Sequence, residues 1–527
     1  MKKRTFLLAL LLIAACVLSA CGQNSGQYLK FYLTAEPKNL DPQLADDPAS
    51  LTVIGNLFEG LVRLNDEGEI VPAGCKNYTV SDDQKTYTFQ IRDDAKWSDG
   101  QKVIAGHYSF GILRALTKST GAPYARLLFG IKNARAFYNG EVNSKQVGVA
   151  TPDDATLVIT LEAPNERFLT ALTYPVAFPC PYGFFNNTKG RYGMESEAVI
   201  ANGPFQLKNW LHGEDPSLNL RKNDAYHSPA DVLPAGINLP VVSDTDFAIN
   251  RFEAKVVDAI TLPPAQLSEV EEQQPVLETF RSTTYLLVFN QKSAVFKNKT
   301  LREAFALAID PQTLKKDQPA YLSAADRILP PAVTLPDTAR SASIKPAYQP
   351  DTAKTRYQTG LAALQKDKLP MTTLLVPDND ALKRVAANLQ ESWKTQLGAI
   401  LNIEPLPDKD YQTMLKSGQY DCAIVPATSS QDDLQSFLLP FTSNNAQNVF
   451  GYASSDYDNL VAAVADATSG KAAADAALSA ERKLVSDAIC YPLYFEDSVF
   501  VRQSGVSGIR FSPFGCQADF RSAQKAE

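Results

Sequence analysis

Residues 371 to 425 carry the pattern that most narrowly limits how this chain can fold. An apolar run ends at Val376, and apolar residues then recur at helical spacing from Leu382 to Leu397, where Gly398 ends the predicted helix. A strand, a shorter helix and a third strand follow, at residues 401–404, 411–416 and 420–425. This alternating order predicts parallel strands joined by right-handed crossovers, and therefore an α/β layer structure.

An insertion of mixed strand and helix is predicted for residues 73–202. Within it, residues 86–91 alternate apolar and polar side chains, as a half-buried strand does, and residues 156–161 form a second apolar strand segment. The insertion is expected to fold as a compact α+β unit.

Helical spacing also occurs in residues 51–61 and in the alanine-rich residues 462–480, where Ser469-Gly470 is expected to interrupt the helix. The proline-rich residues 319–350 are unsuited to regular structure, because proline lacks a backbone N–H donor. That segment is predicted to run over the surface.

The amino terminus has the composition of an export signal. Three basic residues precede an apolar run at residues 6–17, which is too short to span a membrane as a mature helix. Residues 18–21 resemble the bacterial lipobox, in which the Cys21 thiol receives a diacylglyceryl group before cleavage; the alternative is ordinary export with a free Cys21. Residues 1–20 are therefore predicted to be a lipoprotein signal peptide and residues 21–28 a flexible tether.

The charge and motif content exclude several classes of protein. Net charge is −7, and it becomes −10 once the three basic residues of the signal segment are removed, which argues against nucleic acid as a partner. The three histidines have no second metal-type ligand at helical or hairpin spacing, and no phosphate loop, G-x-S-x-G or H-E-x-x-H motif occurs. Neither a metal site, a cofactor nor a catalytic group is expected.

Five cysteines follow Cys21, and none forms a C-x-x-C pair. They are Cys75, Cys180, Cys422, Cys490 and Cys516. An odd number leaves at least one unpaired within the chain, and export makes a bridge possible without assigning one. We expect buried free thiols.

Several stretches, in the order in which the family has them, resemble the family 5 extracellular solute-binding proteins, specifically the oligopeptide-binding lipoproteins of ABC-type peptide importers. The matching stretches include EPKNLDP from Glu36, NLFEGLVRL from Asn56, EIVPAGCKNYTVSDDQKTYTFQIRDDAKWSDG from Glu69, APYARLL from Ala122 and YLLVFNQKSAVFKNKTLREAFALAID from Tyr285. Each stretch alone is modest in specificity, but together with the lipobox they are highly specific.

The resemblance implies a two-lobe α/β fold of the periplasmic-binding-protein type II kind, with an additional α+β domain inserted in the first lobe. Domain I would comprise residues 29–72, 203–284 and 497–520, and domain II residues 73–202. Together these make lobe 1. Domain III, residues 285–496, makes lobe 2, and the chain would cross between the lobes near residue 284 and again near Asp497. Two crossings make a hinge about which lobes can close over a ligand.

By the same resemblance, the protein would be a monomer tethered to the outer side of the bacterial cell membrane by its lipid anchor. It would capture short peptides between the lobes and deliver them to the permease and ATPase subunits of an ABC importer. A non-peptide solute, such as a metal chelate, a sugar or an amino-acid derivative, is the alternative cargo. A surface lipoprotein hydrolase is a more distant alternative, as is a receptor or adhesin.

The loop that follows Val425 is predicted to face the cleft, because ligands of open parallel sheets lie beyond the carboxyl ends of the strands. It carries Asp432 and Asp433, and a peptide ammonium taken from water needs an anionic acceptor. Here the sequence departs from the family pattern: Ser430 stands where the family has an aspartate, and Ala427 where it has a tryptophan. Asp432 or Asp433 would substitute for that aspartate, or would instead cap the helix that begins at Leu434.

Three further residues are candidates by position. Asp46 aligns with a cleft-lining acid of the family, and otherwise is a solvated loop residue. Tyr124 and Tyr285 could line a peptide groove with their hydroxyl groups, or could pack in the core.

Overall fold

The strand and helix alternation of residues 371–425 folds as predicted in the computed structural model, which describes residues 27–335 and 343–526. The elements are β14 (Thr373–Pro377), α12 (Asp380–Leu397), β15 (Asn402–Leu406), α13 (Asp408–Ser417) and β16 (Cys422–Ala427). β14 pairs in parallel with both β15 and β16, which confirms the predicted pairing. The Asn379 side chain caps α12, and Gly398 ends that helix in the left-handed conformation with φ of 66°.

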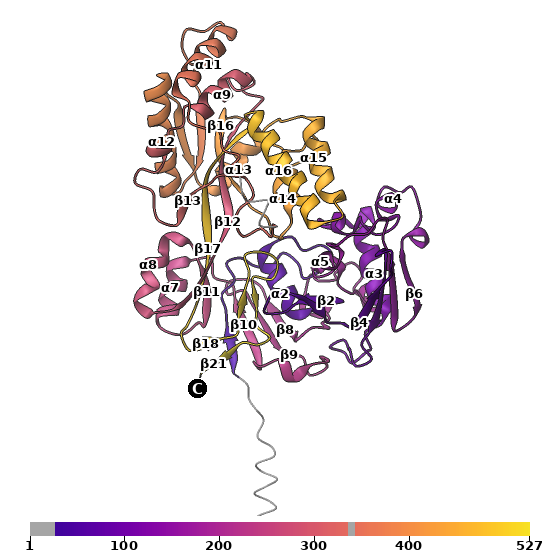
Figure 1. Cartoon of the computed structure of the whole chain (residues 1–527). Coiled ribbons are helices and arrows are strands. Elements are labelled where there is room, and N and C mark those ends of the chain that lie inside the picture. The colour runs from indigo at the N-terminus through magenta and orange to yellow at the C-terminus, as the bar shows by residue number, and fades with distance from the viewer. Residues whose placement is uncertain (1–26, 336–342, 527) are drawn as a thin grey trace, which may run out of the picture.

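These strands belong to a seven-stranded sheet that crosses the whole molecule (Figure 1). Its order is β11-β17-β12-β16-β14-β15, with β13 paired to β17. The further members are β11 (Ala259–Leu262), β12 (Val276–Phe289), β13 (Leu322–Ala324) and β17 (Cys490–Arg502). β12 and β17 are antiparallel and pair from Val276–Arg502 to Val288–Cys490, with register shifts at Arg281/Thr283 and Tyr285/Leu286. The two long strands therefore connect the predicted lobes.

Lobe 1 contains a second sheet of order β1-β10-β9-β8, in which only β1 and β10 are parallel. Its strands are β1 (Tyr28–Lys30), β8 (Phe205–Leu211), β9 (Ser217–Lys222) and β10 (Gly236–Pro240). Three two-stranded pairs complete this lobe: β2 (Val62–Leu64) with β3 (Ile70–Pro72), β18 (Val506–Ser507) with β21 (Gln524–Lys525), and β19 (Arg510–Phe511) with β20 (Ala518–Asp519). Its helices are α2 (Pro48–Leu57), α7 (Thr245–Glu253) and α8 (Leu267–Val270).

The insertion has its own antiparallel sheet of order β4-β5-β7-β6, at the side of lobe 1 (Figure 1). Its strands are β4 (Cys75–Val80), β5 (Thr86–Ile91), β6 (Val149–Asp153) and β7 (Thr156–Thr160), and its helices are α3 (Ala105–Leu116), α4 (Ala134–Tyr138), α5 (Phe168–Ala171) and α6 (Tyr182–Asn187). β5 alternates half-buried and buried residues, as its sequence predicts.

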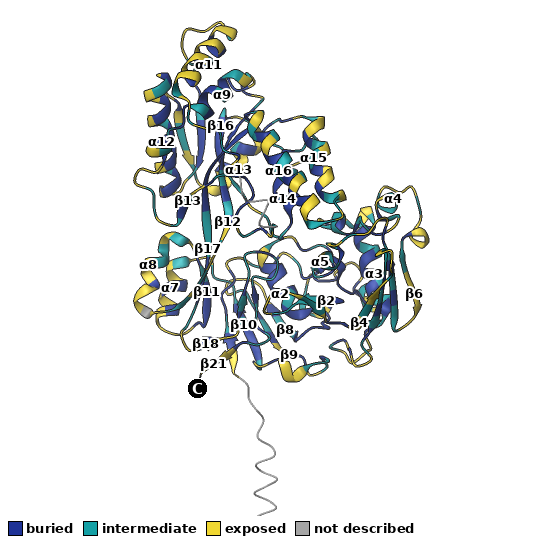
Figure 2. Ribbon diagram, in the orientation of Figure 1, coloured by how far each residue is buried: buried dark blue, intermediate teal, exposed yellow. Residues whose placement is uncertain are grey.

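The helices of lobe 2 cover its part of the central sheet. Besides α12 and α13 they are α9 (Lys299–Leu307), α10 (Pro311–Leu314), α11 (Pro350–Ala363), α14 (Leu434–Leu438), α15 (Ser455–Asp466) and α16 (Gly470–Ser486). The predicted interruption near Ser469 is confirmed, because α15 ends at Asp466 and the Ser469 side chain caps α16. Figure 2 shows the central strands buried and the outer faces of α11, α12, α15 and α16 exposed.

Two sequence predictions are wrong in part. The helix expected over residues 51–61 ends at Leu57, because Phe58 adopts an extended backbone with φ of −119° and ψ of 158°. The proline-rich segment is not wholly superficial, since the backbone N–H groups of Ile328 and Leu329 donate to Oε1 of the buried Glu481 at 2.7 and 2.8 Å. That acceptor lets the segment enter the core of lobe 2.

Separate hydrophobic clusters form the two lobes. The largest joins residues 29–259 with 500–523, whereas residues 287–494 supply another centred on Phe305 and Trp393. The predicted signal peptide and Cys21 lie outside the described residues, and the domain limits stay a prediction.

Candidate functional site

The loop between β16 and α14 lies at the boundary between the lobes. The Ser430 carbonyl accepts a hydrogen bond from the Gly515 N–H of lobe 1 at 2.8 Å. Phe437 of α14 meets Phe514 edge to face, with ring centroids 6.2 Å apart. Lobe 2 is thus held against lobe 1 at the carboxyl end of a central strand, where ligands of such sheets bind.

Three of the predicted site residues come together beside this loop. The Tyr124 side chain lies close enough to Ser430 and to Asp46 for both to influence its pKa. Burial raises the pKa of Tyr124, so its hydroxyl stays protonated and available as a donor. Asp46 itself is half exposed and pairs with Lys38 at 3.2 Å.

Asp433 caps the helix that follows the loop, which is the second of the two roles that the sequence left open. It accepts hydrogen bonds from the Ser436 N–H at 3.0 Å and the Ser436 hydroxyl at 2.8 Å, and it forms an ion pair with Arg126 of the insertion. Burial acts to raise the pKa of Asp433, but Arg126 and Ser436 outweigh it and the pKa lies below its ordinary value. The buried carboxylate is therefore charged and fully engaged by the protein.

Asp432 has different surroundings. Its Oδ1 accepts a hydrogen bond from the Thr334 N–H at 2.9 Å, and its Oδ2 accepts one from the Thr334 hydroxyl. Its backbone carbonyl accepts from the Tyr174 hydroxyl at 2.7 Å. Burial raises the pKa of Asp432, since the two bonds to Thr334 only partly offset the loss of water.

Tyr285 lies away from this group, in the central sheet. Its hydroxyl donates to Oε1 of Glu496 at 3.1 Å, across the β12–β17 ladder. In the neighbouring ladder Tyr285 is opposite Pro426, at the end of β16. The structure therefore couples Tyr285 to the strand from which the loop departs, and does not bring it to Tyr124 and Ser430.

The insertion contributes contacts that the sequence analysis missed. Besides Arg126 and Tyr174, Arg167 donates from Nη1 to the Val464 carbonyl of lobe 2 at 3.3 Å, and the Glu166 N–H donates to the Thr468 carbonyl at 2.9 Å. Arg126 stands two positions after Tyr124 in the APYARLL stretch, so its place in a family-like stretch could have indicated it as a candidate site residue. Its partner is 307 residues away and could not be identified from one sequence.

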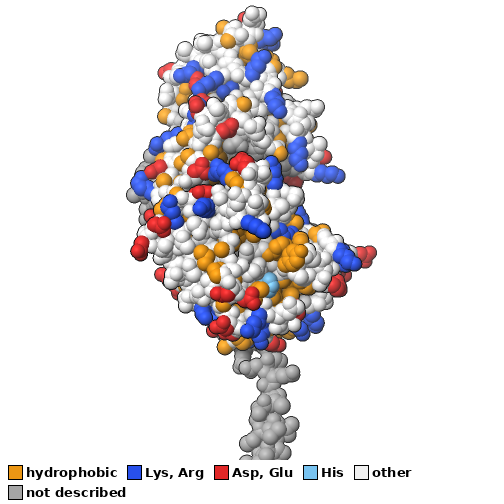
Figure 3. All heavy atoms as spheres, turned by 90° about the vertical axis from the view of Figure 1, so that its right-hand side faces the viewer, with side chains coloured by type: hydrophobic (Ala, Val, Ile, Leu, Met, Phe, Trp, Pro, Cys, Tyr) orange, Lys and Arg blue, Asp and Glu red, His pale blue; other side chains and the backbone are white. Residues whose placement is uncertain are grey.

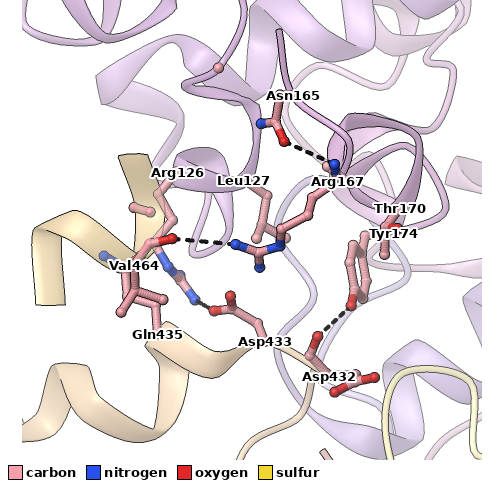
Figure 4. Close-up of a pocket in the computed structure, with 13 residues that line it drawn as sticks. Arg126, Leu127, Asn165, Arg167, Thr170, Tyr174, Asp432, Asp433, Gln435 and Val464 are labelled. Carbon is pink, nitrogen blue, oxygen red and sulfur yellow. Dashed lines mark hydrogen bonds and ion pairs between the residues drawn. The ribbon is translucent and has the colours of Figure 1, made fainter. Parts of the chain in front are cut away.

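A small cavity of about 70 Å³ lies between the insertion and lobe 2. Its lining includes Arg126, Arg167 and Tyr174 from the insertion. In Figure 4, Arg126 and Arg167 enter from the insertion, while Asp432 and Asp433 enter from the loop of lobe 2. The two cations and two carboxylates balance in charge. Figure 3 shows both acidic and basic side chains scattered over the face that it presents.

A larger hollow of about 420 Å³ lies at the carboxyl end of β16 within lobe 2. Most of its walls are apolar, and they include Ala427, Phe437 and Phe441. Ala427 is the position at which the sequence departs from the family tryptophan. A small side chain there leaves the hollow open beside the loop.

Within residues 27–335 and 343–526, no group of three or more His, Cys, Asp or Glu side chains could hold a metal ion, and no helix is long and apolar enough to cross a membrane. The five cysteines after Cys21 are free thiols; four are buried and Cys516 is partly buried. Burial raises the pKa of Cys75 to about 11, so this thiol is unreactive at neutral pH.

Comparison with known proteins gives a consistent result over nearly the full length. The family model described as "Bacterial extracellular solute-binding proteins, family 5 Middle" matches residues 69–449. The dipeptide-binding protein DppE of Bacillus subtilis is 30% identical, over 91% of this chain and 89% of its own. The oligopeptide-binding protein OppA of the same organism is 27% identical, over 99% of each chain. A probable deoxycholate-binding periplasmic protein of Escherichia coli, YgiS, is 26% identical, over 92% of this chain and 90% of its own.

Solved structures of the two-lobe type superpose on this chain. The peptide-bound OppA of Listeria monocytogenes has a TM-score of 0.76 at 26% identity, and covers 96% of this chain and 100% of its own. The substrate-binding domain of an oligopeptide ABC transporter from Bacillus anthracis has the same TM-score at 27% identity, covering 95% of this chain and 99% of its own. The predicted fold class is confirmed.

Proposed function

The chain belongs to the bacterial extracellular solute-binding proteins of family 5, and we propose that it captures short peptides between its lobes for delivery to an ABC importer. Its relatives are substrate-binding proteins of transporters and not enzymes. The observation that carries the proposal is the full-length likeness to a protein solved with peptide bound. The position of the β16–α14 loop between the lobes supports it.

In this proposal the peptide lies beside the loop and contacts Asp46, Tyr124 and Ser430 directly. An extended peptide would satisfy its backbone groups against the end of β16, as in strand addition, which gives affinity with little sequence selectivity. The apolar hollow beside Ala427 receives one ligand side chain. Asp432 and Asp433 hold the loop in place, and Tyr285 supports β16 from the neighbouring strand.

Opening of the cleft would bend β12 and β17 at their register shifts near Arg281 and Tyr285. It would also separate Arg126 from Asp433 and Tyr174 from Asp432, since these pairs join the insertion to lobe 2. Closure restores the contacts around the ligand. The cycle needs no covalent chemistry.

Native mass spectrometry of the protein lacking residues 1–21, purified gently from its host, tests the ligand class. A ladder of peptide masses is expected. One defined non-peptide mass would contradict the proposal. Thermal-shift screening with short peptides is an independent measurement, because a ligand that binds only the folded state raises the melting midpoint.

We further propose that Cys21 carries a diacylglyceryl group that anchors the protein outside the cell membrane, with residues 22–28 as the tether. Two acyl chains are about what stable anchoring requires. A Cys21→Ser variant should leave the membrane fraction and appear in the soluble one. Retention of the variant in the membrane fraction would refute the anchor without bearing on the ligand.

A non-peptide solute is the second candidate, favoured by two specific observations. Both carboxylates of the loop are engaged by protein groups, and a relative of similar identity is named as a probable deoxycholate-binding protein. The same native mass measurement decides between the two candidates.

A further inference from the structure

A second cavity lies behind the β16–α14 loop, on the side of lobe 1, and has a volume of about 140 Å³. Its walls come from α2, from residues 58–64, from the turn at residues 173–178 and from residues 510–521. A buried water needs roughly 10–15 Å³, so the cavity can hold more than a single water molecule. Lobe 2 contributes one residue to the lining, Gln431.

The floor of this cavity is firmly built. Asn56 of α2 donates from Nδ2 to the Ala518 carbonyl at 2.8 Å, and its Oδ1 accepts from the Phe520 N–H at 3.1 Å. Gly55 packs so closely on Cys516 that an added Cβ would lie 2.5 Å from the cysteine Cβ. The position of the 510–521 segment is therefore fixed by α2.

The charged groups of the lining are unequal in number. Three arginines, Arg63, Arg510 and Arg521, face two acids, Glu59 and Asp519. Both acids are already engaged: Glu59 bonds to the Tyr226 hydroxyl at 2.7 Å and to the His227 ring at 2.6 Å, and Asp519 accepts from the Arg521 N–H at 3.0 Å and from Arg510 Nη2 at 3.4 Å. The lining thus carries an excess of one positive charge.

Two side chains of the lining have buried polar atoms that find no hydrogen-bond partner among the described residues. These atoms are Nε and Nη1 of Arg521 and both amide atoms of Gln431. Gln431 is 1% exposed, and its backbone is held by Ser429, whose hydroxyl donates to the Gln431 carbonyl at 2.7 Å. These three buried N–H groups and one amide oxygen call for a polar ligand, because leaving such atoms unpaired is unfavourable.

We propose that this cavity binds a small oxyanion, held by the guanidinium groups of Arg521 and Arg510 and covered by the Gln431 amide of lobe 2. A guanidinium offers paired N–H donors whose spacing matches carboxylate or phosphate oxygens. The Gln431 NH₂ adds a further donor, and its carbonyl oxygen suits a protonated phosphate oxygen.

Arg63, Arg510, Asp519 and Arg521 also line a second, more open hollow of about 370 Å³ on the surface of lobe 1. That hollow carries the further acids Asp66, Glu67 and Asp231, so the excess of positive charge is confined to the inner cavity. Because Gln431 belongs to the loop that Gly515 holds at Ser430, the oxyanion contacts both lobes only when they are together. Binding therefore favours the closed arrangement.

Equilibrium dialysis of the purified protein against labelled inorganic phosphate, at constant ionic strength in chloride, tests the site. One saturable phosphate per chain is expected, and Gln431→Leu should weaken it about tenfold, as loss of a hydrogen bond to a charged group does. Arg521→Gln should abolish binding. Since Arg521 also supports Asp519, that variant risks misfolding, and Gln431→Leu keeps the test decisive. Arg191→Gln, which removes an exposed arginine paired with Glu195, is the matched control and should leave binding unchanged.

The oxyanion could be a free ion or a carboxylate of the captured ligand, and a second arm separates the two. A short peptide acid and its carboxamide are compared in the wild type and in Gln431→Leu. A preference for the acid that the variant loses, without phosphate binding, assigns the ligand's own carboxylate to the cavity. Saturable phosphate binding that the variant weakens assigns a free ion. If neither effect is seen, the proposal of an oxyanion site is overturned. Peptide capture is tested separately, by whether the peptides bind at all.

Discussion

Two of the places where the lobes are joined are built from different interactions. At the hinge, β12 and β17 pair through backbone groups along nearly their whole length. Between the insertion and lobe 2, which we call the rim, most contacts are made by side chains, with Arg126 on Asp433 and Tyr174 on the Asp432 carbonyl, beside one backbone hydrogen bond from the Glu166 N–H to the Thr468 carbonyl. Backbone pairing depends little on which side chains are present, whereas each side-chain contact at the rim is lost when one residue is replaced. The hinge can therefore flex without breaking, and substitutions that alter opening should concentrate at the rim.

Replacing Arg126 with methionine should have the largest effect. The Arg126 and Asp433 side chains are 17% and 5% exposed, so the variant leaves a buried carboxylate without its cation. A loss of about 3 kcal/mol in the free energy of unfolding is expected. Small-angle scattering should also show a larger radius of gyration, because the rim contact is lost.

The double variant Arg126→Met/Asp433→Leu is its control, since it removes both charges and should recover part of the loss. Equal scattering profiles for wild type and Arg126→Met would show that the rim does not hold the lobes together. Asp433→Asn should weaken the same contact, whereas Asp432→Asn should act only through Thr334.

Glu481 lies inside lobe 2, in neither the β12–β17 hinge nor the rim. A substitution there should therefore change stability without changing the opening of the lobes. Burial raises the pKa of Glu481 from 4.5 to about 7. The folded state therefore favours the protonated acid, and stability is highest below pH 4.5 and falls as the pH rises through about 7, by about 3 kcal/mol from this group alone. Glu481→Gln should remove that dependence while keeping an acceptor for Ile328 and Leu329. Urea unfolding of the wild type and of Glu481→Gln at pH 5 and pH 7.5 measures this dependence. If the free energy of unfolding changes equally with pH in both proteins, Glu481 is not the group responsible.

Tyr174→Phe removes a single hydrogen bond at the rim, and the contact between the insertion and lobe 2 should be weakened by about 1 kcal/mol. The aromatic ring stays, so packing is preserved and the effect should appear as easier opening. Peptide affinity measured by calorimetry should fall by about fivefold, since closure contributes to binding. Unaltered affinity together with unaltered scattering would exclude a role for this contact in closure.

Ser282→Ala at the hinge should have the smallest effect. The Ser282 and Ser498 hydroxyls are 2.5 Å apart across the β12–β17 pair, but the backbone bonds of the ladder remain in the variant. The free energy of unfolding should fall by less than about 1 kcal/mol, and the opening of the lobes should not change. Arg135→Met is a rim counterpart of similar size, because Arg135 and Asp466 are 50% and 54% exposed and such pairs contribute about 0–1 kcal/mol. A large opening in Ser282→Ala would reverse the comparison.

Local pattern predicted much of the fold. The helix from Asp380 to Leu397 and its parallel strands follow from apolar periodicity, with Gly398 marking the end of the helix. The break at Ser469 follows from its capping side chain. The buried course of Ile328 and Leu329 could not be read in the same way, because it depends on a carboxyl group 152 residues further along the chain.

The candidate site was predictable to a smaller extent, for the same reason. The loop was located by the end of β16, and Tyr124 and Ser430 lie together in the structure. Whether Asp432 or Asp433 was free depended on Thr334 and Arg126, which come from distant segments. Adjacent acids look equivalent in a sequence, and only their long-range partners distinguish them.

Since β12 and β17 run through both lobes, the seven-stranded sheet belongs to neither lobe alone. Lobe 2 cannot unfold on heating while lobe 1 stays fully folded, because the same two strands would have to be folded at one end and unfolded at the other. A chain of this length would ordinarily be expected to come apart in steps. Here the shared strands should merge those steps into one calorimetric peak.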